Sequence, residues 1–174
     1  MMRVGKYALG AMLAGLVAHF AFIYATPRML MGAAFDRLSA GGANLWNVAD
    51  RVTPLSRTIV RPSPHFAYSA CAYDLSNGPL AIRVGSWHAY WSLSLYAANS
   101  DNYFVIDDRE ARHGVDVVLV QRGHDAPEDA RRVVQSPSTR GIALIRRLAP
   151  TADEYNRARE VARGDVCSAL TPTP

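Results

Sequence analysis

One uncharged, mostly apolar run close to the N-terminus constrains this chain more than any other feature. The run extends from Tyr7 to Thr26, with Lys6 before it and Arg28 after it. About 20 residues at the rise of an α-helix can cross the hydrocarbon core of a bilayer. Since the rest of the sequence is polar enough for a soluble domain, the chain is predicted to be a single-pass protein, held in a bacterial inner membrane through residues 7–26.

A cleaved secretory signal peptide is the alternative interpretation of this run. Signal peptides have a shorter apolar stretch and a cleavage site between small residues. The best candidate here, Ile23-Tyr24-Ala25, begins with a large residue, and Pro27 follows it. The sequence therefore favours a retained anchor over residues 1–27. Arg3 and Lys6 indicate a cytoplasmic N-terminus, which places the domain in the periplasm.

The charge pattern argues against nucleic-acid binding. The net charge is +4, but Lys6 is the only lysine, and the arginines are dispersed among acidic residues. A nucleic-acid surface needs a basic stripe with stacking aromatics, which this sequence does not show. We therefore expect no nucleic-acid partner.

The two cysteines, Cys71 and Cys167, leave two interpretations open. An even count in an exported domain allows one disulfide. The alternative is a pair of unrelated buried thiols, and the spacing is not that of a metal site. If the C-terminal helix packs back on a sheet, a disulfide would fasten the end of the chain to the core.

The chain divides into three parts: an anchor over 1–27, an amphipathic linker over 28–57, and a β-rich soluble domain over 58–174. Residues 27–39 are helix-like and apolar on one side, as in a helix lying at a membrane surface. Gly41-Gly42 ends that pattern, and residues 44–57 are short and mixed, which we interpret as a helical turn.

The soluble domain is predicted to be α+β and β-rich, with an antiparallel sheet or a sandwich, a C-terminal helix, and the transmembrane helix before it. Short strands at regular spacing are typical of such folds. Asn77-Gly78 is expected to form a hairpin turn, and Trp91, Leu93 and Leu95 should share one face of their strand. Thr151 and Glu154 have the spacing of a capping box, which predicts a helix over 151–163. Gly164 is the expected stop, and the last four residues should fray. The expected strands are residues 66–73, 80–84, 90–96, 103–106, 115–120, 131–135 and 141–147.

These segments also carry a resemblance. Residues 55–62 lead into Tyr68-Ser69, followed by Asp-Leu-Ser-Asn-Gly-Pro at 74–79, Tyr-Trp-Ser-Leu-Ser-Leu at 90–95, and 99–104. Over about residues 55 to 148 this resembles the bacterial domain-of-unknown-function family 1254, which has a Leu-Asp-Leu-Ser-x-Gly-Pro turn before a Tyr-Tyr-Ser-Leu-Gln-Leu strand. The resemblance implies a β-rich domain and no settled activity.

The sequence departs from that family at one segment. Ser63-Pro64-His65-Phe66-Ala67 stands where the family has Asn-Arg-Asp-Thr-Leu. If those polar residues serve a shared site, this chain has lost the site or rebuilt it with Ser63 and His65. Longer members carry a second domain, family 1214, in the same chain. The resemblance therefore implies a partner here, a small membrane-anchored family 1214 protein.

We find no catalytic constellation in the sequence. His65, His88, His113 and His124 lack metal-ligand spacing, so we expect no metal, and we expect no cofactor. Aromatic residues around the third expected strand can line a ligand groove, or form core on one side and an interface on the other. The residues expected to bind a ligand, if there is one, are Ser63, His65, Tyr68, His88 and Tyr90.

Two function classes follow from these observations. The first is a non-enzymatic, membrane-anchored periplasmic subunit that binds a partner chain. The second is a periplasmic protein or enzyme that binds a small or lipid-derived molecule in a pocket under the aromatic strands.

Overall fold

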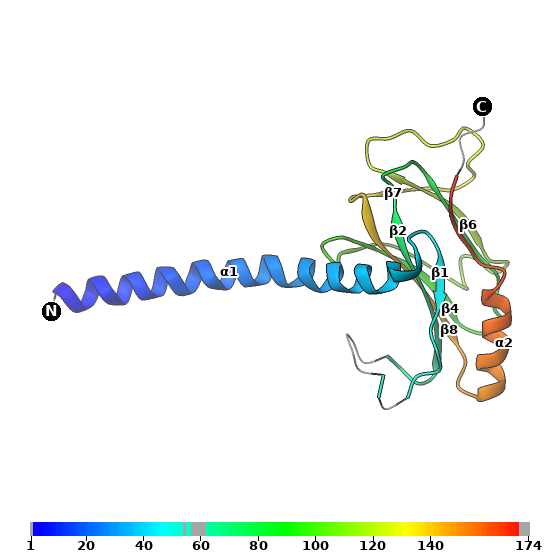
Figure 1. Ribbon diagram of the computed structural model, residues 1–174, viewed down its shortest axis with the longest axis horizontal. Helices are drawn as coiled ribbons and strands as arrows, with labels where there is room; N and C mark the ends of the chain where they lie inside the picture. The colour runs from blue at the N-terminus through cyan, green and yellow to red at the C-terminus, as the bar shows by residue number, and fades with distance from the viewer. Residues whose placement is uncertain (1, 54, 57–61, 171–174) are drawn as a thin grey trace.

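The computed structural model describes residues 2–53, 55–56 and 62–170, with backbone only for residues 2–4. A long helix leads into a domain of two β-sheets and one short helix (Figure 1). The expected boundary at 57 and 58 and the expected frayed tail at 171–174 lie outside the described residues, as do residues 57–61 of the family-like segment.

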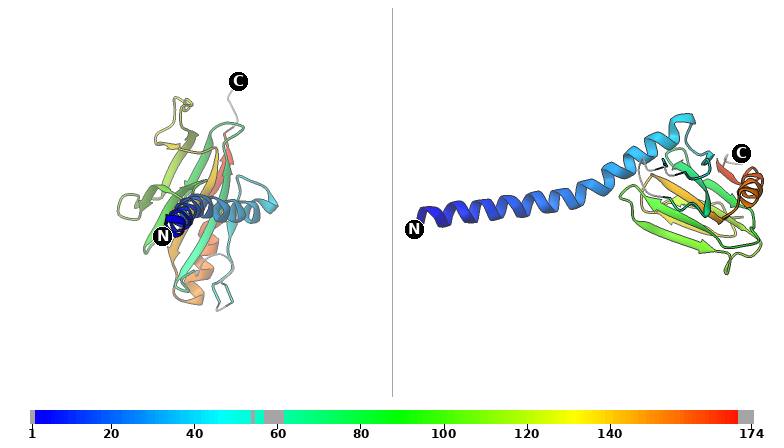
Figure 2. Two further views of the ribbon diagram at one scale, coloured as in Figure 1. Left: turned by 90° about the vertical axis from the view of Figure 1, so that its left-hand side faces the viewer. Right: turned by 90° about the horizontal axis from the view of Figure 1, so that it is seen from below.

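Helix α1 (Met2–Leu38) is a single helix that includes Pro27. Its apolar part extends away from the domain, and none of it is buried (Figure 1). The helix is long and apolar enough to cross a membrane, as a signal sequence near an N-terminus also can be. Residues 28–38 are helical as expected, but they continue the apolar run instead of forming a separate segment. Figure 2 shows that α1 is curved, and a proline inside a helix is a common cause of bending.

The described residues include nine strands, which form two sheets. The five-stranded sheet is antiparallel throughout, and in the four-stranded sheet β6 and β7 are parallel. The predicted class, α+β and β-rich with a sandwich-like core, is confirmed. The five-stranded sheet has the order β1 (Trp46–Val48), β2 (Phe66–Asp74), β8 (Arg140–Leu148), β4 (Trp91–Ala97) and β5 (Asn102–Asp107); the four-stranded sheet has the order β7 (Val133–Ser136), β6 (Val115–Gln121), β3 (Leu80–Val84) and β9 (Val166–Ala169).

The core lies between the two sheets. Alternate residues of each strand face inward, because successive side chains in a strand point to opposite faces. Trp91, Leu93 and Leu95 share the inner face of β4, as predicted, and are fully buried. Ile82 of β3 and Val117 of β6 are fully buried too, in the same apolar cluster. This cluster fills the space beneath the aromatic strand β4.

The hairpin expected at Asn77-Gly78 is wrong. Gly78 does adopt a positive φ of 121° in a turn, but β2 and β3 belong to different sheets. β2 pairs along its whole length with β8, and β3 pairs with β6 and β9. The turn therefore carries the chain from one sheet to the other.

One further expectation needs correction, and one strand was not expected at all. The helical turn expected within 44–57 is wrong, because Trp46–Val48 forms strand β1 at the edge of β2. The segment after the last helix is strand β9, which pairs with β3. Helix α2 (Ala152–Ala162) begins with the predicted capping box at Thr151 and Glu154.

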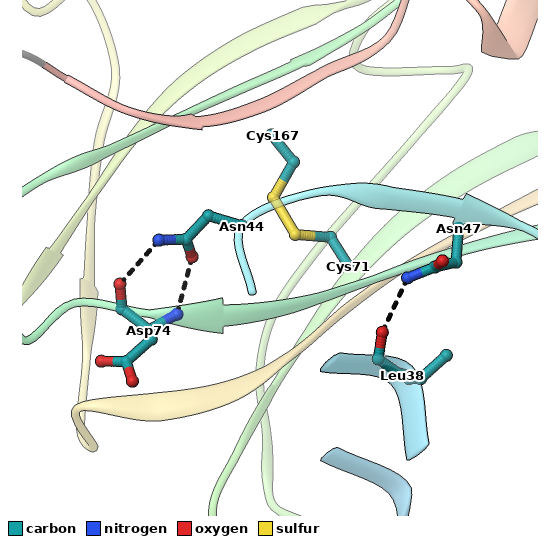
Figure 3. The surroundings of a disulfide bond; sticks show 6 residues. All are labelled: Leu38, Asn44, Asn47, Cys71, Asp74 and Cys167. Carbon is teal, nitrogen blue, oxygen red and sulfur yellow. Dashed lines mark hydrogen bonds between the residues drawn. A yellow bond between two sulfur atoms is a disulfide. The ribbon is translucent and has the colours of Figure 1, made fainter. Parts of the chain in front are cut away.

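A disulfide bond joins Cys71 of β2 to Cys167 of β9, with the Cα atoms 6.7 Å apart (Figure 3). Both residues are buried. The bond links the five-stranded sheet to the four-stranded sheet through the middle of the core. It fastens the C-terminal strand, which the sequence did not predict, to a central part of the fold.

Candidate functional site

The face of the five-stranded sheet that points away from the core, here called the outer face, carries most of the partly exposed aromatic residues of the domain. The strand registers place its side chains in rows across β2, β8, β4 and β5. Three of these rows are Phe66–Leu148–Tyr90, Tyr68–Arg146–Ser92–Asp107 and Ala70–Leu144–Ser94–Val105.

The last turns of α1 cover one end of the outer face. Asn47 of β1 donates a hydrogen bond of 2.9 Å from its amide to the Leu38 carbonyl (Figure 3). At the other end of the contact, the Ser100 hydroxyl donates to the Pro27 carbonyl at 2.8 Å. Ala72 and Ile142, which belong to the same face, are buried there. The helix is therefore attached to the sheet at two points.

The far end of the outer face, here called the aromatic end, brings together four of the five residues expected to bind a ligand. The ring of Phe66 lies 6.2 Å from Tyr68 and 6.0 Å from Tyr90, between ring centroids. The Ser63 backbone N–H donates to the Tyr68 hydroxyl at 2.9 Å. The Ser63 hydroxyl accepts from the His65 backbone N–H at 3.3 Å. These contacts order the loop before β2, and they do not form a nucleophile–base pair.

His88, the fifth expected residue, lies elsewhere. Its ring lies 4.2 Å from the Trp87 ring, between centroids, and is tilted by 53° to it. It lines a surface hollow with Arg112 and with Arg157 and Glu160 of α2. The structure therefore does not bring His65 and His88 into one site.

The outer face combines exposed apolar groups with buried polar ones. Tyr90 is 38% exposed and Val105 is 51% exposed. Between them, the hydroxyls of Ser92 and Ser94 and the Nε of Arg146 are buried without a hydrogen-bond partner among the described residues. Buried polar groups in native proteins are nearly always satisfied. This part of the face therefore combines exposed apolar side chains with buried polar atoms.

The inner face of the same sheet holds a cluster of hydroxyl groups that the sequence did not reveal. The Tyr73 hydroxyl lies 2.9 Å from that of Tyr103 and 3.1 Å from that of Ser136, and it donates to the Tyr96 carbonyl at 3.0 Å. Burial raises the pKa of both tyrosines. Gly141 faces this cluster, and a Cβ there would overlap the Tyr73 hydroxyl. The neutral hydroxyls make internal hydrogen bonds that connect the strands.

A buried ion pair is the other feature that sequence reasoning missed. The Arg147 guanidinium makes two hydrogen bonds, of 2.9 and 2.8 Å, to the Asp165 carboxylate. Both side chains are almost completely buried, at 1% and 0% exposure. Asp165 also accepts from the Gly85 backbone N–H at 2.9 Å. With all of these bonds made, the pair connects β8, the end of β3 and the turn before β9, which is a structural role.

No group of three or more histidine, cysteine, aspartate or glutamate side chains that could hold a metal ion occurs within the described residues. The residues brought together on the outer face are aromatic, aliphatic, hydroxyl and guanidinium groups, with the Asp107 carboxylate of β5 opposite Ser92.

Comparison with known proteins agrees with the family that the motifs suggested. The pattern of the family described as "Protein of unknown function (DUF1254)" matches residues 43–168. The chain belongs to the DUF1254 family. No curated protein matches the chain.

Two solved structures are similar to this DUF1254 chain. The VPA0106 protein from Vibrio parahaemolyticus has a TM-score of 0.67 and 13% sequence identity, with 88% of this chain and 40% of that chain covered. A putative uncharacterized protein from Burkholderia cenocepacia has a TM-score of 0.45 and 14% identity, with 91% and 44% covered. The first likeness shows the fold. This chain spans less than half the length of either protein.

The matched DUF1254 region contains the outer face but not the helix that covers one end of it. Strands β1, β2, β8, β4 and β5 all lie within 43–168, and α1 ends at Leu38. The aromatic end therefore belongs to the family domain, whereas the contact with α1 combines that domain with a segment outside the match.

Proposed function

We propose that this protein is a non-enzymatic, membrane-anchored subunit whose periplasmic domain binds a partner chain through the uncovered part of the outer face. The observation that carries the proposal is the composition of that face. Tyr90 and Val105 are exposed beside buried, unpartnered hydroxyls of Ser92 and Ser94. Aromatic residues with adjacent polar groups are enriched at protein interfaces.

The proposed anchor is α1, inserted with its N-terminus in the cytoplasm. The domain does not cover the apolar residues of α1, since none of its apolar stretch is buried. A retained transmembrane helix accounts for that exposed surface, because hydrocarbon surrounds such side chains at no hydrophobic cost. Arg3 and Lys6 before the span favour a cytoplasmic N-terminus, and in a bacterial inner membrane that orientation puts the domain in the periplasm.

The proposed partner is a small membrane-anchored protein with a family 1214 domain. The solved Vibrio chain carries more than half of its length outside the region similar to this protein. In this proposal, a separate partner chain supplies the domain that a longer chain carries beside its DUF1254 fold. We propose no nucleic-acid partner.

The ligand-binding alternative places a pocket under the aromatic strands. Trp91, Leu93 and Leu95 fill that space in the described structure. A ligand would therefore have to bind on the outer face itself, and not beneath it.

Site-specific photo-crosslinking in membranes tests the proposal. A photoreactive residue at Val105 should crosslink one small anchored chain. The same residue at Val133, which is 41% exposed on the four-stranded sheet, is the matched control and should not. Equal crosslinking at both positions, or none at Val105, would contradict the subunit proposal. Identification of the captured chain by mass spectrometry tests the family 1214 assignment.

A reporter fused after Pro174 tests the anchor. It should be active only outside the cytoplasm, and the full-length chain should stay in the membrane fraction after carbonate extraction. A mature chain that begins near Thr26 would show that the run is a cleaved signal peptide.

A further inference from the structure

A groove of about 610 Å³ lies where the last turns of α1 meet two turns of the five-stranded sheet. One wall is the helix from Arg28 to Asp36, and the others are residues 97–101, between β4 and β5, and 137–141, between β7 and β8. This helix–domain groove is separate from the aromatic end of the outer face. The helix wall contributes the apolar side chains of Met31 and Phe35, and charged residues from the helix and from both turns also line the groove.

The position of the groove along α1 is what points to an occupant. If Tyr7 to Thr26 spans the hydrocarbon core, Arg28 lies about 3 Å beyond it and Met31 about 7 Å beyond it, at the helical rise per residue. The headgroup layer of a bilayer is about 5–7 Å thick on each side. The near half of the groove is therefore at headgroup depth. The hydrogen bond from Ser100 to Pro27 brings the turn between β4 and β5 to the same depth.

The charged residues of the groove are balanced. Arg28 and Arg140 supply two positive groups, and Asp36 and Asp101 supply two negative groups. The Arg140 guanidinium lies 5.5 Å from the centroid of the Phe35 ring and uses its Nε–H to bind Asp74 at 2.7 Å. Arg28 uses one N–H to bind the Tyr24 carbonyl at 2.8 Å. A guanidinium has five N–H donors, so each arginine keeps donors for another acceptor.

We propose that the helix–domain groove binds the headgroup of a zwitterionic phospholipid that carries a primary ammonium group. Arg28 binds its phosphate, because guanidinium groups match phosphate oxygens in geometry and charge. The carboxylate of Asp101, next to the Ser100–Pro27 contact, accepts hydrogen bonds from its ammonium. Asp36 lies about 15 Å beyond the span at the helical rise, and Arg140 lies beside Phe35, so both are past the headgroup layer. One positive and one negative group at headgroup depth fit a headgroup with both signs better than an anionic headgroup, which would meet the carboxylate. This proposal rests on the proposed function, because it requires α1 to span a membrane.

The test uses the full chain in detergent micelles, supplied with equal amounts of phosphatidylethanolamine, phosphatidylglycerol and phosphatidylcholine with the same acyl chains. Native mass spectrometry counts the lipids retained. Phosphatidylethanolamine should be retained about threefold to fivefold over the other two, the upper part of the range that one exposed ion pair contributes. Preference for phosphatidylglycerol, or equal retention of all three, would overturn the proposal.

Variants assign the roles. Asp101→Asn should abolish the preference for phosphatidylethanolamine. Arg28→Gln should lower the retention of all three lipids about threefold, as loss of one exposed ionic contact does. Arg37→Gln, an exposed arginine of the same helix that does not line the groove, is the matched control and should change nothing. An equal effect of Arg28→Gln and Arg37→Gln would show that general charge, and not the groove, retains lipid.

Two further arms separate the possible causes of failure. Soluble glycerophosphoethanolamine at the lipid's concentration should not displace the lipid; if it does, the site binds a free phosphodiester and the lipid proposal is wrong. Carbonate extraction is measured on the same cells. Release of the chain from membranes would overturn both the anchor and the groove proposal, whereas an anchored chain without lipid preference would overturn the groove proposal alone.

Discussion

Removal of the Cys71–Cys167 disulfide should lower the stability of the domain more than any single packing change. The bond joins residues 96 positions apart in the sequence. In the chain-entropy model, a crosslink that closes a loop of about 100 residues restricts the unfolded chain by about 4.7 kcal/mol at 25 °C. It also ties together the two sheets that enclose the core.

The stabilisation by the disulfide is a large part of the total stability of the domain, because the free energy of unfolding of small domains is about 5–15 kcal/mol. We expect removal of the bond to lower the free energy of unfolding by about 3–5 kcal/mol. Native-state strain and residual structure in the unfolded chain reduce the value of the chain-entropy model. Guanidinium denaturation of the detergent-solubilised chain, followed by tryptophan fluorescence, measures it directly. The three samples are the oxidised chain, the same chain with a phosphine reductant, and the double variant Cys71→Ala with Cys167→Ala.

The double variant is the control for the reductant. It should match the reduced chain and should not respond to the reductant, since the described residues contain no free cysteine. A stability loss below about 1 kcal/mol on reduction would refute the reasoning, because the loop-closure term would then be nearly absent. Expression without an export signal, in a reducing compartment, should give a chain without the disulfide and with the same lowered free energy of unfolding.

Three other perturbations have expected outcomes. Asp165→Asn, which leaves a buried guanidinium without its charge partner, should cost about 3–5 kcal/mol in denaturant unfolding, whereas Asp116→Asn in an exposed pair should cost less than about 1 kcal/mol. Burial raises the pKa of Tyr73 and Tyr103, so the unfolded chain releases these protons at a lower pH than the folded chain. The free energy of unfolding should therefore fall as the pH rises above about 10, the ordinary tyrosine pKa. Tyr103→Phe should make this fall less steep when unfolding is measured from pH 8 to 11. Thr151→Ala removes the cap of α2 and should lower the unfolding free energy by about 1 kcal/mol, with a proportionate fall in the thermal midpoint.

Features that depend on adjacent residues were predictable from the sequence. The period-two pattern of Trp91, Leu93 and Leu95 identified the inner face of β4, and the capping box located the start of α2 within a residue. Both signals are complete within a few positions of the chain. The turn at residues 74–79 was also recognised, because its turn residues act locally.

Strand partners were not predictable in the same way. A turn signal shows that the chain changes direction, but not which strand it then meets. β2 pairs with β8, whose first residue, Arg140, follows the end of β2 by 66 positions. β1 and β9 are strands of three and four residues. Strands this short exist only because longer neighbours offer them hydrogen bonds, so their own sequence carries little signal.

The burial of Arg147 could have been predicted from the period-two alternation of side chains along β8. Arg147 alternates in phase with Ile145 and Ala143, both fully buried, whereas Arg146 is in phase with Leu144 on the outer face. Treating the adjacent arginines as one surface feature concealed this difference. Parity along the strand predicts that one of them points into the core and needs a buried acidic partner, although it does not say which acid.

The attachment of α1 to the domain connects the proposals. The contacts at Pro27 and at Leu38 lie about 16 Å apart along the helix at its rise per residue, and each is a hydrogen bond to a different part of the five-stranded sheet. A helix held at two separated points cannot swivel freely, so the orientation of the span in the bilayer also fixes the direction of the outer face. A partner that binds the aromatic end must then meet the domain at one height and one angle. That restriction favours a partner which is itself anchored, because a chain held in the same membrane searches only the orientations that the bilayer allows. The groove would strengthen this geometry, since a lipid headgroup bound between helix and domain opposes the same swivel that the two hydrogen bonds resist.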